Sequence, residues 1–473
     1  MTARSAGEAG EIESPGRAGS DRLTEPLALR GRRPGDIPLL AALQPNILRP
    51  HVRDSLRLLL IQITDPAAAR ASIGRIARNP RLMKTAADHF DEVDAHRGSQ
   101  APGSAFVGIA LSHSGYQRLE VPHHRFPADA AFREGMSARG GALRDPDRCV
   151  WDYAQPIDMI VLVGSHEPEL TAARVALVLD DLRGIRVLAE EPGETLHNKQ
   201  DEPIEHFGYV DGRSQPLFVR EDADHERDTK GGIDVWDPLV SLDRVLVPDP
   251  GVSDRPDCYG SYLIYRKLEQ NVRAFEAKER LVAKLVRLRG ADKERAGAML
   301  VGRFEDGTPV AIRPCETGAI PALNNFTYAD DERGMKCPHF AHIRMMNDRA
   351  LGPRERVVIA RRGQTYGSRP DLADPNASPP VAGVGLLFMA VVSDIPRQFE
   401  QLQQAANGDE THAGDPVIGQ GPAGGAALKF PRVWGRKKTR SCPDALMRPV
   451  TMKGGEYFFL PSITFLRHLD RGP

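Results

Sequence analysis

The pattern of apolar and polar positions predicts strands and helices that alternate irregularly along the chain. Short apolar runs rich in β-branched residues predict strands, and apolar positions recurring every three or four residues predict helices. The expected strands are residues 54–64, 158–165, 260–269, 356–361, 383–393 and 455–462, and the expected helices are 66–79, 169–184, 270–290 and 395–407. This irregular order favours an α+β fold over a doubly wound parallel sheet.

The segments between these elements divide into a polar N-terminal stretch and several long loops. Residues 1–35 mix Gly, Ser, Glu and Arg with few large apolar side chains, so we expect them to remain mobile. The folded part is expected to begin near "IPLLAALQPNIL", residues 37–48. Residues 368–382 and 406–426 are rich in Pro, Gly, Ala and Asp, which predicts long surface loops.

Composition narrows the class of protein. With 41% hydrophobic and 27% charged residues, the 473-residue chain matches an ordinary soluble globular protein. Its net charge of −1 gives no argument for a nucleic-acid or anionic-membrane partner. No stretch approaches the roughly 18 apolar residues of a membrane helix. The arginines of "RGRRPGDIPLLAAL" are followed by too short an apolar run for a signal peptide.

The cysteines indicate a reducing compartment. Their number is odd, they are scattered, and none forms a C-x-x-C pair, so neither a disulfide framework nor a zinc knuckle is indicated. We therefore expect a cytoplasmic protein. The five positions are Cys149, Cys258, Cys315, Cys337 and Cys442.

The stretch "HFGYVDGRSQPLF", residues 206–218, contains one acid between two glycines. Gly208 and Gly212 let the backbone adopt tight or left-handed conformations, and they let a bulky group approach Asp211 closely. The pattern raises the question of which group would come so near a carboxylate.

The stretch "MKCPHFAHIRMMNDR", residues 335–349, contains candidate metal ligands. A helix starting at Pro338 would place His339 and His342 one turn apart on one face. Together with Cys337 they could bind zinc, although that set lacks a fourth ligand. A single histidine bound to heme iron is the other metal interpretation, with nearby arginines pairing with the heme carboxylates. A histidine in a solvent-facing helix would need no metal at all.

The stretch "RVVIARRGQTYG", residues 356–367, delivers two arginines to a glycine turn. A guanidinium leaving a buried strand needs a counter-charge, an anionic ligand or water. Because strand side chains alternate, Arg361 and Arg362 should point to opposite faces. Val357 and Ile359 share the face of Arg361, whereas Arg362 is expected to reach solvent, an acidic partner or a heme carboxylate.

Together these stretches resemble the dye-decolorizing peroxidases, a family of heme enzymes. "GYVDG" is similar to the family's G-x-x-D-G signature, "CPHFAHIR" to the segment with the proximal heme histidine, and "ARRGQTYG" to the segment with the distal arginine. Further similar pieces include "LQPNIL", "NNFTYADD" and "GGEYFFLPS", so the resemblance runs from residue 43 to the C-terminus. The length is like that of the larger members. Asp348 and Thr365 stand where the family often has proline.

The resemblance implies a role for each matching residue. His342 would be the iron ligand, Asp211 the distal acid-base residue and Arg361 the distal arginine. Asp394 falls near the position where some members place the acid that accepts the Nδ1 proton of the ligand. The remaining cofactor-binding residues implied are Arg344, Arg349, Leu386 and Phe388.

The resemblance also implies a fold and an activity. The fold would be α+β, with two ferredoxin-like halves at residues 36–205 and 206–473, each an antiparallel sheet with peripheral helices, as in the dimeric α+β barrel-like superfamily. The enzyme would carry one heme b per chain, mainly in the second half. It would reduce hydrogen peroxide and oxidise an organic electron donor such as a dye or phenol through a ferryl intermediate.

Two other function classes stay open from the residues alone. A heme carrier or iron-release protein would need the axial histidine and the cations, but not both Asp211 and Arg361. A zinc protein or metal-dependent hydrolase would use Cys337, His339 and His342.

Overall fold

The computed structural model describes residues 22–471, except for 31, 32, 34, 52, 100–102, 147–151, 154, 319–322, 351, 353, 354, 375, 410, 411, 420–426 and 443–447. The first part of the chain forms α2 (Asp36–Ala42), β1 (Ser55–Ile63), α3 (Pro66–Arg78), α4 (Ala86–Ser99), β2 (Phe106–Ser112), α5 (His113–Arg118), α6 (Ala130–Glu134), α7 (Gly140–Leu143), β3 (Met159–Ser165), α8 (Pro168–Asp181), β4 (Ile185–Glu194), β5 (Leu196–His197) and β6 (Pro203–Ile204).

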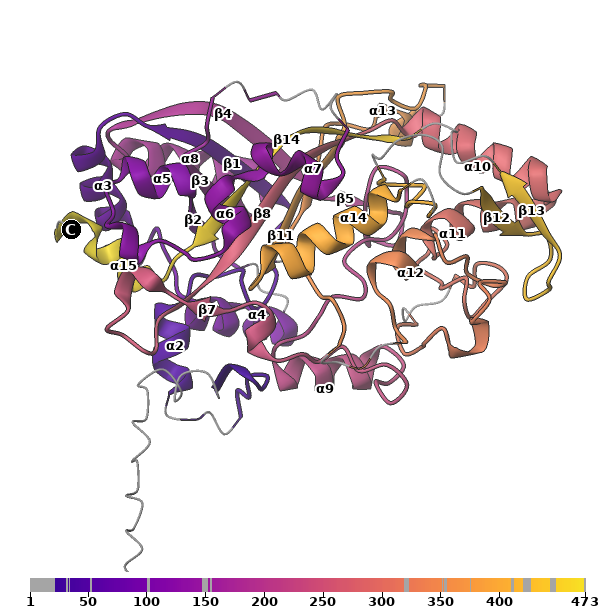
Figure 1. Cartoon of the computed structure of the whole chain (residues 1–473), viewed down its shortest axis with the longest axis horizontal. Coiled ribbons are helices and arrows are strands. Elements are labelled where there is room, and N and C mark those ends of the chain that lie inside the picture. Colours follow the sequence, from indigo (N-terminus) through magenta and orange to yellow (C-terminus); the bar gives the residue numbers. More distant parts are fainter. Residues whose placement is uncertain are drawn as a thin grey trace, which may run out of the picture.

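The second part of the chain forms α9 (Arg220–Thr229), β7 (Val247–Pro248), β8 (Tyr259–Gln270), α10 (Val272–Val286), α11 (Arg295–Val301), α12 (His342–Met346), β9 (Ala360–Arg361), β10 (Gln364–Tyr366), α13 (Pro370–Ala373), β11 (Gly385–Val392), the π-helix η7 (Ile395–Glu400), α14 (Gln401–Asn407), β12 (Leu428–Pro431), β13 (Thr439–Cys442), β14 (Val450–Leu460) and α15 (Ile463–His468). Figure 1 shows α3 and α8 at one end of the molecule, and α10 with β12 and β13 at the other.

Within the described residues, one antiparallel sheet of ten strands organises the molecule. Its main path runs β10-β11-β8-β14-β2-β3-β1-β4, and the short strands β7 and β9 pair beside it. In each group of four, the first strand lies between the third and the fourth, which is the ferredoxin-like order. The structure is therefore the expected α+β fold of two ferredoxin-like halves. The division near residue 205 stays a prediction.

Both faces of the sheet are covered because its strands are apolar on both sides. Along β1, Leu59 and Ile61 pack into one cluster with Ile73 of α3 and Val178 of α8. The alternate residue Leu60 packs on the other face, with side chains of α2 and α4. Successive strand side chains point to opposite faces, so a run such as "LRLLLIQI" supplies two cores at once.

Some element boundaries differ from those expected. The folded part begins earlier than residue 36, because Leu27 is buried and its amide donates to the carbonyl of Phe218, 2.8 Å away. Residues 1–21 of the expected mobile segment, like Cys149, lie outside the described part. The helix expected to continue to Gly290 ends at Val286, where Arg287 adopts a left-handed conformation with φ of 64°.

The helix expected from Pro338 begins only at His342. The carboxylate of Asp331 accepts hydrogen bonds from the amides of Met335, Lys336 and Cys337, which holds that segment in a turn. Likewise, the strand expected over residues 356–361 pairs only at Ala360–Arg361, and the carbonyl of Val358 accepts from the side chain of Gln398.

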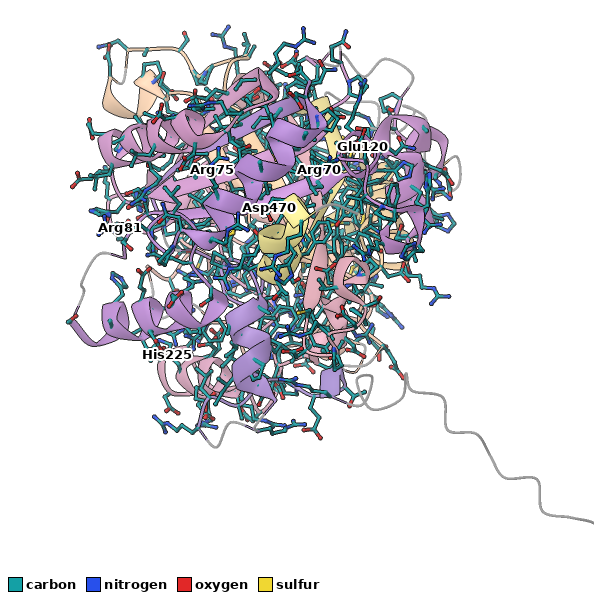
Figure 2. All side chains as sticks on the ribbon, turned by 90° about the vertical axis from the view of Figure 1, so that its left-hand side faces the viewer. Arg70, Arg75, Arg81, Glu120, His225 and Asp470 are labelled. Carbon is teal, nitrogen blue, oxygen red and sulfur yellow. The ribbon has the colours of Figure 1, made fainter. Side chains whose placement is uncertain are left out.

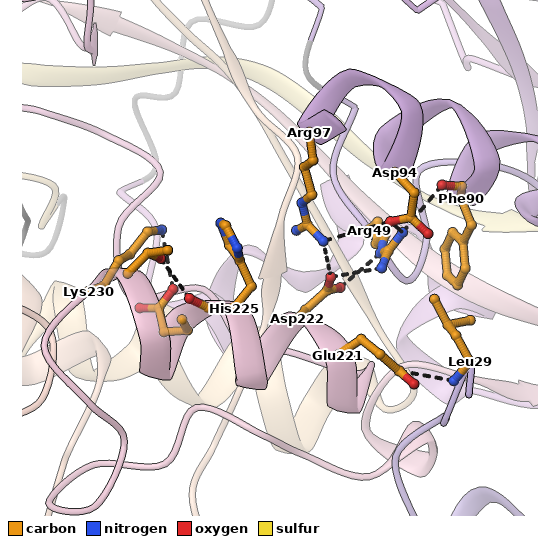
Figure 3. A network of polar contacts seen from close by, with 11 residues as sticks. Leu29, Arg49, Phe90, Asp94, Arg97, Glu221, Asp222, His225 and Lys230 are labelled. Carbon is orange, nitrogen blue, oxygen red and sulfur yellow. Dashed lines mark hydrogen bonds and ion pairs between the residues drawn. The ribbon is translucent and has the colours of Figure 1, made fainter. Parts of the chain in front are cut away.

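Buried ion pairs join distant parts of the chain. Asp222 of α9 accepts from both Nε and Nη2 of Arg49, each at 2.8 Å, and from Arg97 of α4 at 2.8 Å (Figure 3). The Asp222 network fixes α9, which follows the G-x-x-D-G loop, against the first half.

At the surface, Arg70 of α3 pairs with Glu120 at 2.8 Å (Figure 2). Of the helices described, none is both long enough and apolar enough to cross a membrane.

Candidate active site

A cavity of about 830 Å³ lies between strands of the second half of the sheet and neighbouring loops. Leu386 and Phe388 of β11, with Arg266 and Leu268 of β8, present their side chains to it. These positions are paired across the two strands, Phe388 with Arg266 and Leu386 with Leu268, so they share one face. The cavity therefore has a largely apolar floor to which Leu386 and Phe388 contribute, and their contact with a cofactor stays a prediction.

The same cavity carries an ion pair between Asp211 and Arg361. Nη1 of Arg361 lies 2.8 Å from Oδ1 of Asp211, and each side chain is about one-third exposed, at 35% and 33%. Nη2 of Arg361 donates to the carbonyl of Arg213. The side-chain amide of Gln215 donates to the carbonyl of Arg361 and accepts from its backbone N–H. The G-x-x-D-G loop thus positions both groups.

The carboxyl of Asp211 is held ionised by its neighbours. Burial alone would raise its pKa, but attraction to Arg361, a hydrogen bond from the amide of Gly212 and attraction to His342 together lower the pKa below its usual value. The amide of Gly212 lies 2.6 Å from Oδ1, and Gly212 has a φ of 77°. The second glycine of the motif is therefore required by a left-handed backbone.

His342 begins α12 and faces the same cavity. Its Nδ1 lies 2.6 Å from Oδ2 of Asp415, whose side chain is completely buried. The other oxygen of Asp415 accepts from the amides of Val417 and Ile418. Because Nδ1 is engaged by a carboxylate, Nε2 is the ring nitrogen available to bind a metal.

The sequence assigned the carboxylate partner of His342 incorrectly. Asp394 caps η7 instead, where its Oδ1 accepts from the amide of Arg397 at 2.9 Å. Asp415 lies in the segment 406–426, which was expected to be a surface loop. An Asp-Pro step does signal a turn there, but no local pattern indicates that the turn folds back onto His342.

The two other arginines assigned to the cofactor differ in position. Arg344 does not line the cavity, because its guanidinium bonds the carboxylate and carbonyl of Asp331 and the carbonyl of Cys337. Arg349 is buried beside the cavity, and its Nη2 lies 2.8 Å from the hydroxyl of Ser214, which does line it. Where the family often has proline, Asp348 makes the turn by accepting from the amide of Ala350.

Arg361 and Arg362 both line the cavity, but the guanidinium of Arg362 is bonded to backbone carbonyls. Its Nε donates to the carbonyl of Asn46 and its Nη2 to the carbonyl of Ile47, each at 2.6 Å. Its Nη1 donates to the carbonyl of Arg361. Its side chain is buried, and it contacts neither bulk solvent nor an acidic side chain of the described residues; a contact with a heme carboxylate stays a prediction. It joins the strand end to the first half of the chain.

One end of the cavity collects buried donors without a hydrogen-bond acceptor. Among the described residues, Nε1 of Trp236 and the Nε atoms of Arg303, Arg349 and Arg356 have no acceptor. Arg349 and Arg356 lie against the indole of Trp236, at 4.5 and 4.0 Å from its centroid. Burial lowers the pKa of Arg303 to about 10 and that of Arg349 to about 9. Buried cations in this state favour an anionic ligand.

These groups fit a heme. A histidine with a carboxylate partner can bind the iron, the apolar floor suits the ring, and the unpaired donors around Ser214 suit the ring's carboxylates. The zinc interpretation does not fit. His339 is exposed while Cys337 is buried, and no group of three His, Cys, Asp or Glu side chains within the described residues could hold a metal ion.

Comparison with known proteins places the chain in a family. No protein-family model matches it. It is 45% identical over 458 residues to the multifunctional dye peroxidase DyP2 of Amycolatopsis sp. (strain ATCC 39116 / 75iv2), covering 91% of this chain and 96% of the relative. A dye-decolorizing peroxidase of Auricularia auricula-judae is 30% identical, with coverage of 76% and 74%.

Solved structures agree with this relationship. DyP2 from Amycolatopsis sp. ATCC 39116 superposes with a TM-score of 0.88 at 43% identity, covering 94% of this chain and 99% of that one. A DyP-type peroxidase of Anabaena sp. gives 0.86 at 34% identity, covering 95% and 99%. Dye-decolorizing peroxidases are heme enzymes. Fold, cavity and relatives together make this chain a member of the dye-decolorizing peroxidase family.

Proposed function

We propose that this enzyme binds one heme b per chain through His342, reduces hydrogen peroxide to water and oxidises dyes, phenols or other organic donors in one-electron steps. The observation that carries the proposal is the pair Asp211–Arg361, 2.8 Å apart, in the same cavity as His342 with its carboxylate partner. A heme carrier would need the histidine but has no use for a paired acid and cation in the same cavity.

The heme, when bound, supplies the oxidation chemistry and stores the two oxidising equivalents of the peroxide. Asp211 accepts the proton from the inner oxygen of hydrogen peroxide and returns it to the outer oxygen, which leaves as water. Arg361 stabilises the negative charge that develops on that outer oxygen. In the free cavity the neighbouring guanidinium helps to keep Asp211 ionised, and so able to accept a proton, before peroxide arrives.

Asp415 fixes the tautomer and orientation of the His342 ring, which leaves Nε2 to bind the iron. Leu386 and Phe388 would supply apolar surface for the ring. Arg349, through Ser214, and the unpaired donors beside Trp236 would hold the cofactor's carboxylates.

We further propose a cytoplasmic location, supported by the free thiols of Cys258, Cys315 and Cys337. The identity of the organic donor is expected to follow from screening dyes and phenols.

An absorption spectrum of the purified protein, with and without added heme, tests the proposal. We expect a Soret band, and a change in that band within seconds of adding hydrogen peroxide, followed by its return when a dye is supplied. A Soret band that does not respond to peroxide would favour the carrier alternative. No band after heme addition would overturn heme binding altogether.

A further inference from the structure

The turn that carries Asp211 is built around a second carboxylate, Glu205. Oε2 of Glu205 lies 2.9 Å from the amide of Phe207, and Oε1 lies 3.2 Å from the amide of Tyr209. The backbone closes the same turn, because the amide of Glu205 donates to the carbonyl of Tyr209 at 3.1 Å. Gly208 has a φ of 99°, which the tight turn requires.

This turn sets the position of Asp211. Directly beyond it, Val210 pairs with Ile204, and the amide of Asp211 donates to the carbonyl of Pro203 at 2.9 Å. A change in the turn would therefore displace Asp211 relative to Arg361.

Gln270 connects the turn to the sheet. Its Nε2 lies 2.6 Å from Oε2 of Glu205, and Gln270 is the last residue of β8, the strand that also supplies Arg266 and Leu268 to the cavity floor. Glu205 and Gln270 both line the cavity. The carboxylate is thus held from three directions by N–H donors, an arrangement that fixes it far more tightly than a surface carboxylate.

We propose that Glu205, anchored by Gln270, is a positioning residue that fixes Asp211 for proton transfer with peroxide. This inference rests on the proposed function. Burial raises the pKa of Glu205 to about 7 despite these donors, and Asp211 adds to the rise. The carboxyl is therefore costly to keep in this place, which argues for a role beyond closing a loop.

The test compares Glu205→Gln, Gln270→Leu and Glu305→Gln in the heme-loaded enzyme. Glutamine at 205 keeps the size but offers one acceptor oxygen where two are used. Leucine at 270 removes only the connection to β8. Glu305 is the matched control, because its carboxylate faces the same turn at Gly208, while the amides of Phe207 and Tyr209 already donate to Glu205.

We expect Glu205→Gln to slow the reaction with hydrogen peroxide by on the order of ten- to a hundredfold, because a displacement of about 1 Å has that effect on a reacting group. Gln270→Leu should give a smaller slowing and Glu305→Gln none. Association of cyanide, which must lose a proton to Asp211 on binding, should slow in the same order. The second-order rate with the dye should not change, since that step does not use Asp211.

Two further measurements separate positioning from a general loss of structure. Amide exchange of Phe207 and Tyr209 should accelerate in Glu205→Gln even without heme. In an Asp211→Asn background, Glu205→Gln should cause no further slowing, because its effect acts through Asp211. Equal slowing in both backgrounds, or slower dye oxidation to the same extent, would overturn the inference. A native enzyme that ignores peroxide would instead overturn the proposed function.

Discussion

Asp415 and His342 form a hydrogen-bonded pair, with 2.6 Å between Oδ2 and Nδ1, although they are 73 positions apart in the sequence. The carboxylate has no exposed surface, and its second oxygen is satisfied by two backbone amides. The imidazole is therefore held in one tautomer and one orientation before any metal is bound.

Replacing Asp415 should weaken heme binding and change the reduction potential of the iron. In Asp415→Asn the imidazole loses its anionic partner, so we expect about a ten- to hundredfold lower heme affinity and a higher reduction potential of the iron. Heme transfer to apomyoglobin measures the affinity, and spectroelectrochemical titration measures the potential.

Asp394→Asn provides the control, because Asp394 caps a helix rather than contacting His342. It should leave both quantities at the native values. A shift of the potential in Asp394→Asn but not in Asp415→Asn would mean that the imidazole changes its partner when heme binds.

The adjacent arginines should fail in different ways. Arg361→Leu removes the cation beside Asp211, so its reaction with peroxide should slow at least about tenfold, since one charge-stabilising donor contributes roughly 3 kcal/mol. Stopped-flow mixing measures this rate, and the melting temperature should change little.

Arg362→Leu should instead lower the melting temperature, because the carbonyls of Asn46, Ile47 and Arg361 lose a buried donor. Any folded Arg362→Leu protein should react with peroxide nearly as fast as the native enzyme. If it were the slower of the two variants, the assignment of Arg361 as the distal cation would be wrong.

The reaction with peroxide should persist into acid. The lowered pKa of Asp211 keeps its carboxylate ionised, and thus able to accept a proton, below the usual carboxyl pKa of about 4. Between neutral pH and about 4 the rate should fall only as far as protonation of Glu205, whose pKa is about 7, loosens the turn, and it should fall further only below the usual carboxyl range, where Asp211 itself is protonated. Dye oxidation, which consumes protons, should be fastest on the acid side of neutrality. A rate that rises steadily through pH 8 would contradict Asp211 as the proton acceptor.

Stability should fall as the pH rises through neutrality. Burial raises the pKa of Glu279 to about 8 and that of Glu305 to about 7. Such carboxyls bind more protons in the folded than in the unfolded state between about pH 4 and 8, so the free energy of unfolding decreases over that range. Melting curves should show this decrease, and Glu279→Gln should make it shallower. Parallel curves for the native and variant proteins would refute the cause.

The elements that sequence predicts well are those whose apolar pattern matches their burial. The two-sided runs in β1, β3, β8 and β11 are apolar because both faces are covered, and the pattern alone identifies them. Asp211, Arg361 and His342 were found because they stand in motifs that match the family.

The site residues that were missed or misplaced depend on contacts between distant segments. Asp415 looks like any acid in a loop, and its burial against His342 follows from how the chain folds back over α12. Arg344 was assigned to the cofactor by proximity in sequence, yet Asp331 engages it. Arg362 was expected to reach water, an acidic partner or a heme carboxylate, and no local pattern indicates the three backbone carbonyls that it bonds.

The order of the strands also has a consequence for synthesis of the chain. The seam between the two halves is β14, which pairs Phe458 with Ser112 of β2 on one side and with Leu263 of β8 on the other. Both neighbouring edges must wait for this late strand to leave the ribosome, and such long-range pairing is slow. Until then β2 and β8 present unpaired edges, which are templates for aggregation. We expect the supply of chaperones to limit the yield of this enzyme in a heterologous host more than the supply of heme does. A nascent chain stalled before residue 450 should be insoluble.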